Sequence, residues 1–274
     1  MIPGPPVNGI VLCGGLGTRL HPRTLERPKT LLPIGATTPL DLAIGHFARY
    51  NIRHVTLCVG YKGELIFDHV TGRAAAPPRF DRNGTMTAVV GTGLAIPTTV
   101  TVLDTGAGTA TGGRLRRALP ELPQGEVIVA YGDILSDVNL DQLMAAHHAT
   151  GLTATLTVAR AHSPYGHVSI TPDGVVTKLA EKPRLADWVN IGFIAMSDSV
   201  AEYLTPDSGQ LEYELLPRLA AAGQLAAFRH EGHFEPMDTV SDHDRLCQLW
   251  ESDQLGWLGD TVPAASASSS SSDS

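Results

Sequence analysis

Residues 8–20 read NGIVLCGGLGTRL, an apolar run that passes directly into a glycine-rich loop and an arginine. The first part, Asn8 to Cys13, is rich in Ile, Val and Leu and predicts a buried β-strand. The glycines that follow let backbone N–H groups approach phosphate oxygens closely, because glycine has no Cβ. Arg19 and Lys29 add the positive charge that a triphosphate and its departing pyrophosphate require. The stretch therefore predicts a strand and loop that hold a nucleoside triphosphate.

The spacing of the glycines excludes two commoner phosphate-binding loops. A dinucleotide-binding fingerprint needs a third glycine where Leu20 stands, which argues against a nicotinamide-dependent dehydrogenase. A P-loop needs Gly-Lys-Ser or Gly-Lys-Thr, and neither occurs in the chain. The glycines alone are equally consistent with an ordinary turn, so the prediction depends on the Thr18-Arg19 and Pro28-Lys29 that follow them.

Alternating strand-like and helical runs predict the fold class. Apolar runs that predict buried strands occur at 8–13, 54–59, 100–103 and 127–131, and helical patterns occur at 39–50, after Thr38, and at 140–149, after Asn139. This β-α-β order predicts a three-layer α/β/α fold with a mostly parallel, Rossmann-like sheet covered on both faces. Ligands of such sheets bind at the carboxyl ends of the strands, where the glycine loop and Asp133 both fall.

The second half of the chain is less regular. The runs at 168–170 and 175–179 flank Thr171-Pro172-Asp173-Gly174 and predict a small β-hairpin inserted on the acceptor side of the site. Helical patterns at 213–222 and 242–250 close the fold. We expect an N-terminal extension over 1–8, one catalytic domain over 9–262 and a disordered tail over 263–274. The Ala/Ser composition of the tail buries too little apolar surface to offset its ordering entropy.

Composition excludes several classes of protein. A chain of 274 residues with 43% hydrophobic content can bury a substantial core, and its formal net charge of −8 opposes a large nucleic-acid surface. No apolar run approaches the ~20 residues of a membrane-spanning helix, and no basic signal-peptide region precedes the first strand. Cys13, Cys58 and Cys247 have no metal-ligand spacing, which favours free thiols and argues against zinc. We therefore expect a cytoplasmic protein without nucleic-acid or membrane partners.

Two aspartates are candidate ligands for a divalent cation. Asp133 directly follows the apolar run at 127–131, so its carboxylate lies at a strand end beside the predicted phosphate loop. Mg²⁺ suits this place, because it bridges phosphate oxygens and takes one or two protein carboxylates. Asp238, within Pro236-Met237-Asp238-Thr239, is the natural partner. An aspartate after a buried strand also commonly caps a helix or a turn, so the residue type alone leaves both roles open.

Taken together, these motifs resemble the sugar-1-phosphate nucleotidyltransferase family over roughly Gly9 to Trp250. The stretch 102–117, VLDTGAGTATGGRLRR, is similar to the glucose-1-phosphate cytidylyltransferase branch of that family. Shorter matches to the branch are GYKG at 60–63, YGD at 131–133, SDVN at 136–139 and PMDT at 236–239. The resemblance implies a Mg²⁺-dependent transfer of CMP from CTP to a small phosphorylated sugar, with release of pyrophosphate and formation of a CDP-sugar.

The resemblance also implies roles for individual residues. Nucleotide binding falls to Gly14, Gly15, Gly17, Thr18, Arg19, Thr111, Gly113 and Arg114. It implies that Asp133 and Asp238 bind magnesium. It also implies that Arg19, Lys29 and Lys182 contact the reacting phosphates. Contact with the acceptor falls to Gly166, Glu181, Lys182 and Asn190.

The start of the helix predicted at Thr111 offers a way to recognise the base. Free N–H groups there and the Arg114 guanidinium are donors that match the O2 and N3 acceptors of cytosine. Thr109 and Thr111 are equally suited to cap this helix, and both roles are compatible.

Three departures from the family lie on the acceptor side. Ile134 and Ile191 stand where the family has glycine, and Leu211 stands where the family has tryptophan. A β-branched side chain takes up room that glycine leaves open, so we expect an altered acceptor pocket. The acceptor remains open among glucose 1-phosphate, a deoxy- or amino-sugar phosphate, a cyclitol phosphate and another phosphorylated polyol. Two alternatives also remain, namely another triphosphate donor and a catalytically silent nucleotide-binding regulator. The oligomeric state is undefined, although a homo-oligomer is common in the family.

Overall fold

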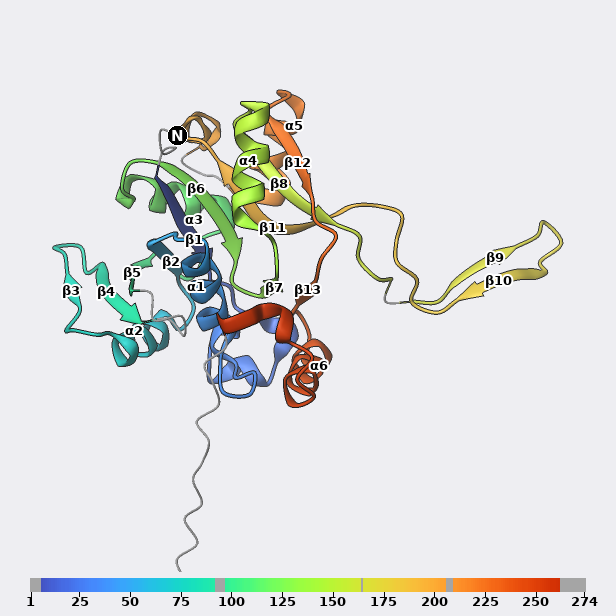
Figure 1. The fold of residues 1–274 in the computed structure, drawn as a ribbon, viewed down its shortest axis with the longest axis horizontal. Coiled ribbons are helices and arrows are strands. Elements are labelled where there is room, and N and C mark those ends of the chain that lie inside the picture. Colours follow the sequence, from blue (N-terminus) through green and yellow to red (C-terminus); the bar gives the residue numbers. More distant parts are fainter. Residues whose placement is uncertain (1–5, 92–96, 164, 206–208, 262–274) are drawn as a thin grey trace, which may run out of the picture.

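The structure is a computed structural model, and it describes residues 6–91, 97–163, 165–205 and 209–261. Among these residues, nine strands form one sheet in the order β12-β8-β11-β6-β1-β2-β5-β4-β3 (Figure 1). The strand predicted near the start of the chain is β1 (Val7–Leu12), which lies in the middle of this sheet. It pairs in parallel with β6 (Glu126–Tyr131) and β2 (His54–Val59). Its Ile10 and Val11 side chains are buried because both faces of the sheet are covered.

The remaining strands extend the sheet on both sides of β1. They are β5 (Pro97–Asp104), β4 (Met86–Gly91) and β3 (Arg79–Phe80) on one side, and β11 (Val189–Met196), β8 (Ala154–Ala159) and β12 (Leu225–Arg229) on the other. Within the described part of the chain, only β11 and β4 run against the direction that the other strands of this sheet share. The prediction of a mostly parallel sheet is confirmed.

Helices cover both faces, which confirms the predicted three layers. On one face, α1 (Pro39–Arg49), α2 (Gly63–Arg73) and α4 (Leu140–Thr150) share a core with the sheet, and on the other face α3 (Thr111–Ala118) and α5 (Leu216–Ala221) do so. Alternate residues of β1 enter the two cores, Val11 one and Ile10 and Leu12 the other. The predicted caps of α1 and α4 are present: Thr38 Oγ1 accepts from Asp41 N at 3.2 Å and Asn139 Oδ1 from Gln142 N at 2.9 Å.

A third apolar core joins the end of the fold to the segment after β1. Leu20, Leu32 and Ile34 from that segment pack with Met237 and with Leu246 of α6 (Val240–Glu251). Between these two parts of the chain, β7 (Ile134–Ser136) pairs antiparallel with β13 (Phe234–Pro236). This pairing brings the segment around residue 238 beside the predicted phosphate loop.

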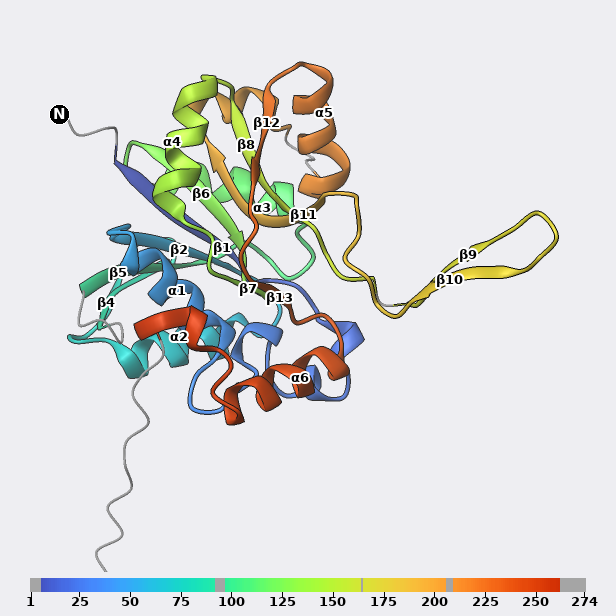
Figure 2. The same ribbon diagram turned by 45° about the vertical axis from the view of Figure 1, so that its right-hand side comes forward.

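The predicted hairpin is present and projects from the body of the molecule. Its strands are β9 (His167–Ile170) and β10 (Val176–Ala180), and the ribbon extends away from the sheet and the helices in both views (Figures 1 and 2). The shorter helical elements are Thr18–Leu20, Arg23–Leu25, Lys29–Leu31, Leu119–Glu121, Asp198–Tyr203, the π-helical turn Leu211–Leu215 and Gly256–Thr261. The tail expected at 263–274 lies outside the described residues. Across the described ranges, no helix combines the length and the apolar character that crossing a membrane requires.

Candidate functional site: a phosphate-loop pocket

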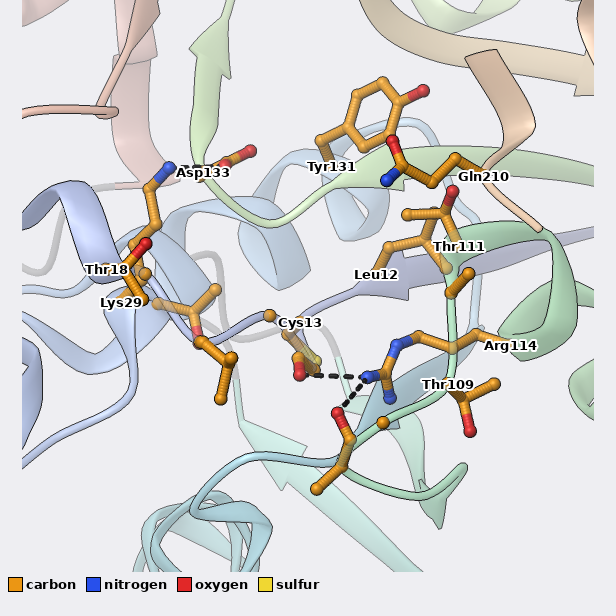
Figure 3. Close-up of a pocket in the computed structure, with 18 of the residues that line it drawn as sticks. Leu12, Cys13, Thr18, Lys29, Thr109, Thr111, Arg114, Tyr131, Asp133 and Gln210 are labelled. Carbon is orange, nitrogen blue, oxygen red and sulfur yellow. Dashed lines mark hydrogen bonds and ion pairs between the residues drawn. The ribbon is translucent and has the colours of Figure 1, made fainter. Parts of the chain in front are cut away.

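A pocket of about 560 Å³ opens at the carboxyl ends of β1 and β6 (Figure 3). This is the edge of the sheet at which the sequence predicted ligand binding. Its lining contains ten of the predicted site residues: Gly14, Gly15, Gly17, Thr18, Arg19, Lys29, Thr111, Arg114, Asp133 and Asp238. Tyr131, Gln210 and the segment 107–110 also line it, and the predictions did not include them among the ligand-binding residues. Segments that are far apart in the sequence therefore converge on one pocket.

The glycine loop has the tight backbone that its sequence predicts. Gly17 has a φ of 61°, in the left-handed region, and it precedes the short helical turn Thr18–Leu20. A Cβ at Gly17 would lie 3.0 Å from Cγ2 of Thr24, whose hydroxyl donates to the Gly17 carbonyl at 2.8 Å. No atom lies within 4 Å of a Cβ built on Gly15. The loop is thus held from one side and open towards the pocket on the other.

Two carboxylates and two cations meet at the rim of the pocket, and we call Arg19, Lys29, Asp133 and Asp238 the charged quartet. Lys29 Nζ donates to Asp133 Oδ2 at 2.6 Å and to Asp238 Oδ1 at 2.7 Å (Figure 3 shows Lys29 beside Asp133). Arg19 Nη2 donates to Asp238 Oδ1 at 2.9 Å. The Lys29 side chain is only 12% exposed, whereas that of Arg19 is 69% exposed. Lys29 is therefore the fixed cation of the quartet and Arg19 the one with freedom to move.

The β7–β13 pairing accounts for the meeting of the two aspartates. Asp133 directly precedes β7, Asp238 follows β13 after one residue, and the Met237 N–H donates to the Asp133 carbonyl at 2.9 Å. The Thr239 side chain then begins α6 in a capping box with Asp242. Asp238 is therefore held between a strand and a helix start, with little freedom in its backbone.

The quartet fits a magnesium ion in its chemistry. Both carboxylates direct an oxygen at one position, which the Lys29 ammonium takes in this structure, so a divalent cation placed there would be shared by the same two carboxylates. Oxygen ligands in this number suit Mg²⁺, which completes its shell with phosphate oxygens and water. In the described ranges, no group of three or more His, Cys, Asp or Glu side chains is arranged to hold a metal ion. Asp133 and Asp238 are the residues that would hold Mg²⁺.

Arg114 lies under the pocket rather than facing a base, which corrects the contact predicted for its guanidinium. Nη1 donates to the Val59 carbonyl at 2.8 Å and to Thr105 Oγ1 at 2.6 Å, and Nη2 donates to the Gly14 carbonyl at 2.9 Å. The residue is 3% exposed, and burial lowers its pKa. Because these donors are already engaged, Arg114 ties the glycine loop to the end of β2 and to Thr105, which follows β5.

The start of α3 is anchored differently from the expected cap. The helix follows Ala110 without a side-chain cap, Thr109 Oγ1 accepts from Arg117 at 2.9 Å, and Thr111 Oγ1 accepts from the Leu211 N–H at 2.8 Å. The Thr111 hydroxyl also lies 3.3 Å from Glu212 Oε2. Capping by Thr109 and Thr111 is therefore wrong, and Thr111 instead joins α3 to the turn at 211–215. Gly113 is not among the residues that line the pocket.

A half-buried tyrosine extends the site beyond the predicted residues. The Tyr131 hydroxyl donates to a Glu212 carboxylate oxygen, and burial together with this contact raises the pKa of Tyr131 above its usual value. Tyr131 lies within the Tyr-Gly-Asp motif, so a signal for it was present, but nothing in the sequence distinguished Gln210 as a pocket residue. Asn190 Oδ1 accepts from the Gly192 N–H at 2.8 Å, so in this structure it also stabilises a turn in β11.

The remaining acceptor residues lie apart from the pocket lining. Gly166 and Glu181 are neighbours at the base of the β9–β10 hairpin, since a Cβ at Gly166 would lie 2.8 Å from Glu181 Oε2. Lys182 follows with a φ of 44°, and neither it nor Gly166, Glu181 or Asn190 is among the residues that line the pocket. The structure brings together the residues predicted to bind the triphosphate, and it places those predicted to contact the acceptor at and near the base of the hairpin.

Two of the three residues that differ from the family pattern lie in the cores and do not line the pocket. Ile191 is 1% exposed and Leu211 is 0% exposed, and both pack in the two cores that flank the sheet. Neither residue is among those that line the pocket, so the structure gives them no direct contact with it, and the altered acceptor pocket stays a prediction. Ile134 is half-buried in β7, in register with Pro236, directly after Asp133.

The thiol near the loop is structural. Cys13 and Cys58 are free and buried, and burial raises the pKa of both thiols, that of Cys58 to about 12. Cys13 Sγ donates to the Cys58 carbonyl at 3.4 Å. A thiol that stays protonated is a poor nucleophile, so the sequence-based argument against a catalytic cysteine agrees with the structure.

Comparison with known proteins gives consistent matches. Residues 8–254 match the family model described as Nucleotidyl transferase. The chain is 32% identical over 262 residues to the glucose-1-phosphate cytidylyltransferase of Salmonella typhimurium, covering 92% of this chain and 98% of that protein. It is 31% identical to the probable glucose-1-phosphate cytidylyltransferase of Bacillus subtilis, covering 92% and 99%. The solved structure of HddC from Yersinia pseudotuberculosis complexed with GMP-PN shares the fold with a TM-score of 0.65 at 20% identity, covering 88% and 98%.

Proposed function

Because the chain belongs to the nucleotidyl transferase family and is a sugar-1-phosphate nucleotidyltransferase, we propose that its donor is CTP and its acceptor is glucose 1-phosphate. The products would be pyrophosphate and a CDP-sugar, with Mg²⁺ as cofactor. The observation that carries the proposal is the charged quartet at the mouth of the glycine loop. Two carboxylates and one half-buried lysine meet there, beside backbone suited to a triphosphate.

The proposed reaction is an in-line substitution at the α-phosphorus of the donor. An oxygen of the acceptor phosphate forms a bond to the α-phosphorus, and the bond from that phosphorus to the bridging oxygen of the β-phosphate breaks. The electron pair leaves with pyrophosphate. Because an ionised sugar phosphate is already a nucleophile, no general base is required, and the protein contributes alignment and charge neutralisation.

The charged quartet suits a reaction in which the protein aligns the phosphates and neutralises their charge. Bound Mg²⁺ would neutralise phosphate charge and orient the reacting oxygens. Lys29 is held at 2.6 and 2.7 Å from the two carboxylates, so a displaced ammonium would remain within the same site and be available to triphosphate oxygens. Arg19 is the most exposed member of the quartet, which suits a side chain that closes on the outgoing pyrophosphate.

Cytosine as the base rests on the two cytidylyltransferase relatives and on the segment that follows β5. The pocket wall opposite Lys29 and Asp133 is made by residues 107–111, which lie within the stretch that resembles the cytidylyltransferases, and by Gln210 (Figure 3). Backbone groups of this segment and the Gln210 amide are the polar groups there that suit the edge of a base. We therefore assign base recognition to this wall, with Arg114 as its support from below.

Glucose 1-phosphate is the first acceptor to test. Ile191 and Leu211 no longer argue against it, because they lie in the cores. Glu181 and Lys182 are proposed to contact the sugar hydroxyls and the sugar-bound phosphate. They are exposed at the base of the hairpin, so they must approach the pocket when an acceptor is bound. Modified sugar phosphates and cyclitol or polyol phosphates are the acceptors to test next.

Pyrophosphate release tests the proposal. The enzyme is incubated with Mg²⁺, each of CTP, dTTP, UTP, ATP and GTP, and each acceptor, and we expect the highest kcat/KM with CTP and glucose 1-phosphate. Turnover with another triphosphate but not with CTP would remove the cytosine assignment. Tight CTP binding by calorimetry without turnover on any acceptor would favour the silent regulator instead.

The metal ligands are tested by Asp133→Asn and Asp238→Asn. We expect each variant to lose at least about 100-fold in kcat, because each amide removes one charge from the shared cation position. Asp68→Asn, on the exposed side of α2 and away from the pocket, is the matched control and should keep full activity. Unchanged metal dependence in both site variants would contradict the assignment.

A further inference from the structure

The lining of the phosphate-loop pocket contains a buried threonine hydroxyl that makes no hydrogen bond within the described chain. Thr30 directly follows Lys29 in the helical turn Lys29–Leu31, and it is 4% exposed. Its side chain lines the pocket, but among the described residues its Oγ1 atom has no hydrogen-bond partner. This hydroxyl is absent from the residues that the sequence singled out.

Other buried threonines show what the Thr30 hydroxyl lacks. Thr24 Oγ1 donates to the Gly17 carbonyl at 2.8 Å. Thr105 Oγ1 donates to the Val59 carbonyl at 2.7 Å. A buried hydroxyl without such a bond costs free energy, because it has given up its hydrogen bonds to water. A ligand that brings a partner to Thr30 would recover this cost.

The position of Thr30 within the site indicates which ligand this is. Lys29, the preceding residue, donates to Asp133 and Asp238. A Cβ at Gly132 would lie 2.7 Å from Thr30 Cγ2, so the Thr30 methyl packs against the residue that precedes Asp133. Thr30 is therefore joined to the charged quartet from two sides, by the chain to Lys29 and by packing to the neighbour of Asp133.

A phosphate oxygen of the nucleotide donor is the partner that fits this place. A threonine hydroxyl can donate one hydrogen bond, and the charged oxygens of a triphosphate are strong acceptors. The pocket that Thr30 lines is formed by the glycine loop and the charged quartet, whereas the residues predicted to contact the acceptor do not line it. The donor triphosphate is therefore favoured over the phosphate of the acceptor.

We propose that Thr30 is a further residue that binds the donor, with its hydroxyl donating to a phosphate oxygen of the bound triphosphate. Rotation about the Cα–Cβ bond exchanges the methyl and the hydroxyl between staggered positions, and it presents the hydroxyl to that oxygen. The complex then gains a hydrogen bond without breaking one within the free protein. The proposal rests on the proposed function for the presence of a triphosphate and not for the identity of its base.

A second buried hydroxyl supplies the matched control. Thr37 Oγ1 also has no partner in the described part of the chain, and Thr37 is 1% exposed. It lies in a turn where it pairs with Ile34, and it is not among the residues that line the pocket. An unpaired hydroxyl by itself therefore identifies no ligand. What distinguishes Thr30 is its place in the lining beside the charged quartet.

The test compares Thr30→Val with Thr37→Val, because valine has nearly the shape of threonine and no hydroxyl. Without nucleotide, each variant should melt roughly 2–8 °C above the unsubstituted chain, since each loses a buried unpaired hydroxyl. Calorimetric titration with CTP and Mg²⁺ should separate the two. Thr30→Val should raise the Kd for CTP about 10–100-fold, as expected for the loss of a hydrogen bond to a charged acceptor, and Thr37→Val should leave it unchanged.

Two further measurements fix the role of the hydroxyl. Thr30→Ser keeps the hydroxyl and should bind CTP more tightly than Thr30→Val. In steady-state kinetics, Thr30→Val should raise the KM for the donor and leave the KM for the acceptor unchanged. An unchanged Kd for the triphosphate, or a rise confined to the acceptor KM, would overturn the proposal. A lower melting temperature for Thr30→Val would also overturn it, because the hydroxyl would then already have a partner in the free protein.

Failure of this proposal is distinguishable from failure of the proposed donor. The titrations are repeated with dTTP, UTP, ATP, GTP and inorganic triphosphate, which carries the phosphates without a base. If the unsubstituted chain binds one of these and not CTP, the cytosine assignment fails, and the affinity of Thr30→Val for that ligand decides the role of Thr30. An unsubstituted chain that binds none of them would overturn both proposals.

Discussion

Replacing Arg114 by methionine separates a supporting role from direct recognition of the base. The guanidinium makes three hydrogen bonds of 2.6–2.9 Å with the Gly14 carbonyl, the Val59 carbonyl and Thr105 Oγ1, and the residue is 3% exposed. Methionine fills a similar length with no donor, so buried acceptors lose their partner. We therefore expect the variant to fold less stably and its glycine loop to be less well ordered.

The size of the expected loss of stability follows from the number of hydrogen bonds that Arg114 makes. A hydrogen bond from a charged donor contributes about 1.5–3 kcal/mol, and three such bonds give a gross loss of about 5–9 kcal/mol. Removing the buried cation offsets part of this loss of free energy, because desolvating a charge is itself costly. We expect a net loss of about 3 kcal/mol in the free energy of unfolding, which corresponds to a fall in Tm of roughly 6–12 °C for a domain of this size.

The assay combines urea unfolding with kinetics. Arg116→Met, on the exposed side of the same helix, is the matched control and should change stability by less than about 0.5 kcal/mol. If Arg114 supports the loop, KM should rise for CTP and for every poorer triphosphate by a similar factor. A variant of full stability that loses its preference for CTP over UTP would refute this reasoning and restore direct recognition of the base.

Three further perturbations follow from the geometry. Lys29→Met removes the cation shared by the two carboxylates and should lower kcat/KM with the triphosphate by about 10²–10³-fold, measured as pyrophosphate release, with a smaller effect on acceptor KM. Gly14→Ala should cost about 1–3 kcal/mol in urea unfolding, because its Cβ would lie 2.0 Å from Arg114 Nη1, whereas Gly15→Ala meets no atom within 4 Å and should be close to neutral. Burial holds the pKa of His46 at about 4, below the unfolded value near 6.5, so the unfolded chain binds the extra proton and stability should fall by roughly 3 kcal/mol between pH 6.5 and pH 4. His46→Gln keeps a donor for the Val138 carbonyl and should flatten that pH profile, and an unchanged profile would contradict the assignment.

Local patterns in the sequence were sufficient to predict the elements and to select candidate residues for the donor side of the site. The Ile/Val run of β1, the left-handed glycine after it and the turn between 170 and 176 depend on neighbouring residues, so they were predictable. The acidic residues at 133 and 238 were singled out by strand ends and by family resemblance. Their meeting depends on the β7–β13 pairing, which joins segments about a hundred residues apart and leaves no local pattern.

Only the tertiary structure decided which way several side chains face. Ile191 and Leu211 looked like pocket residues because they neighbour the predicted acceptor positions, yet they point into the cores. Arg114 lies in a motif typical of nucleotide binding, yet its donors reach the backbone of two other segments.

The sequence by itself determined a glycine-rich loop after a buried strand, a mostly parallel sheet and a hairpin between residues 167 and 180. The tertiary structure decided that Lys29 holds the two aspartates together and that Arg114 supports the loop. The physical reason is the range of the interactions. Periodicity and turn chemistry act over a few residues, whereas side-chain direction depends on strand register, bulges and contacts between distant segments.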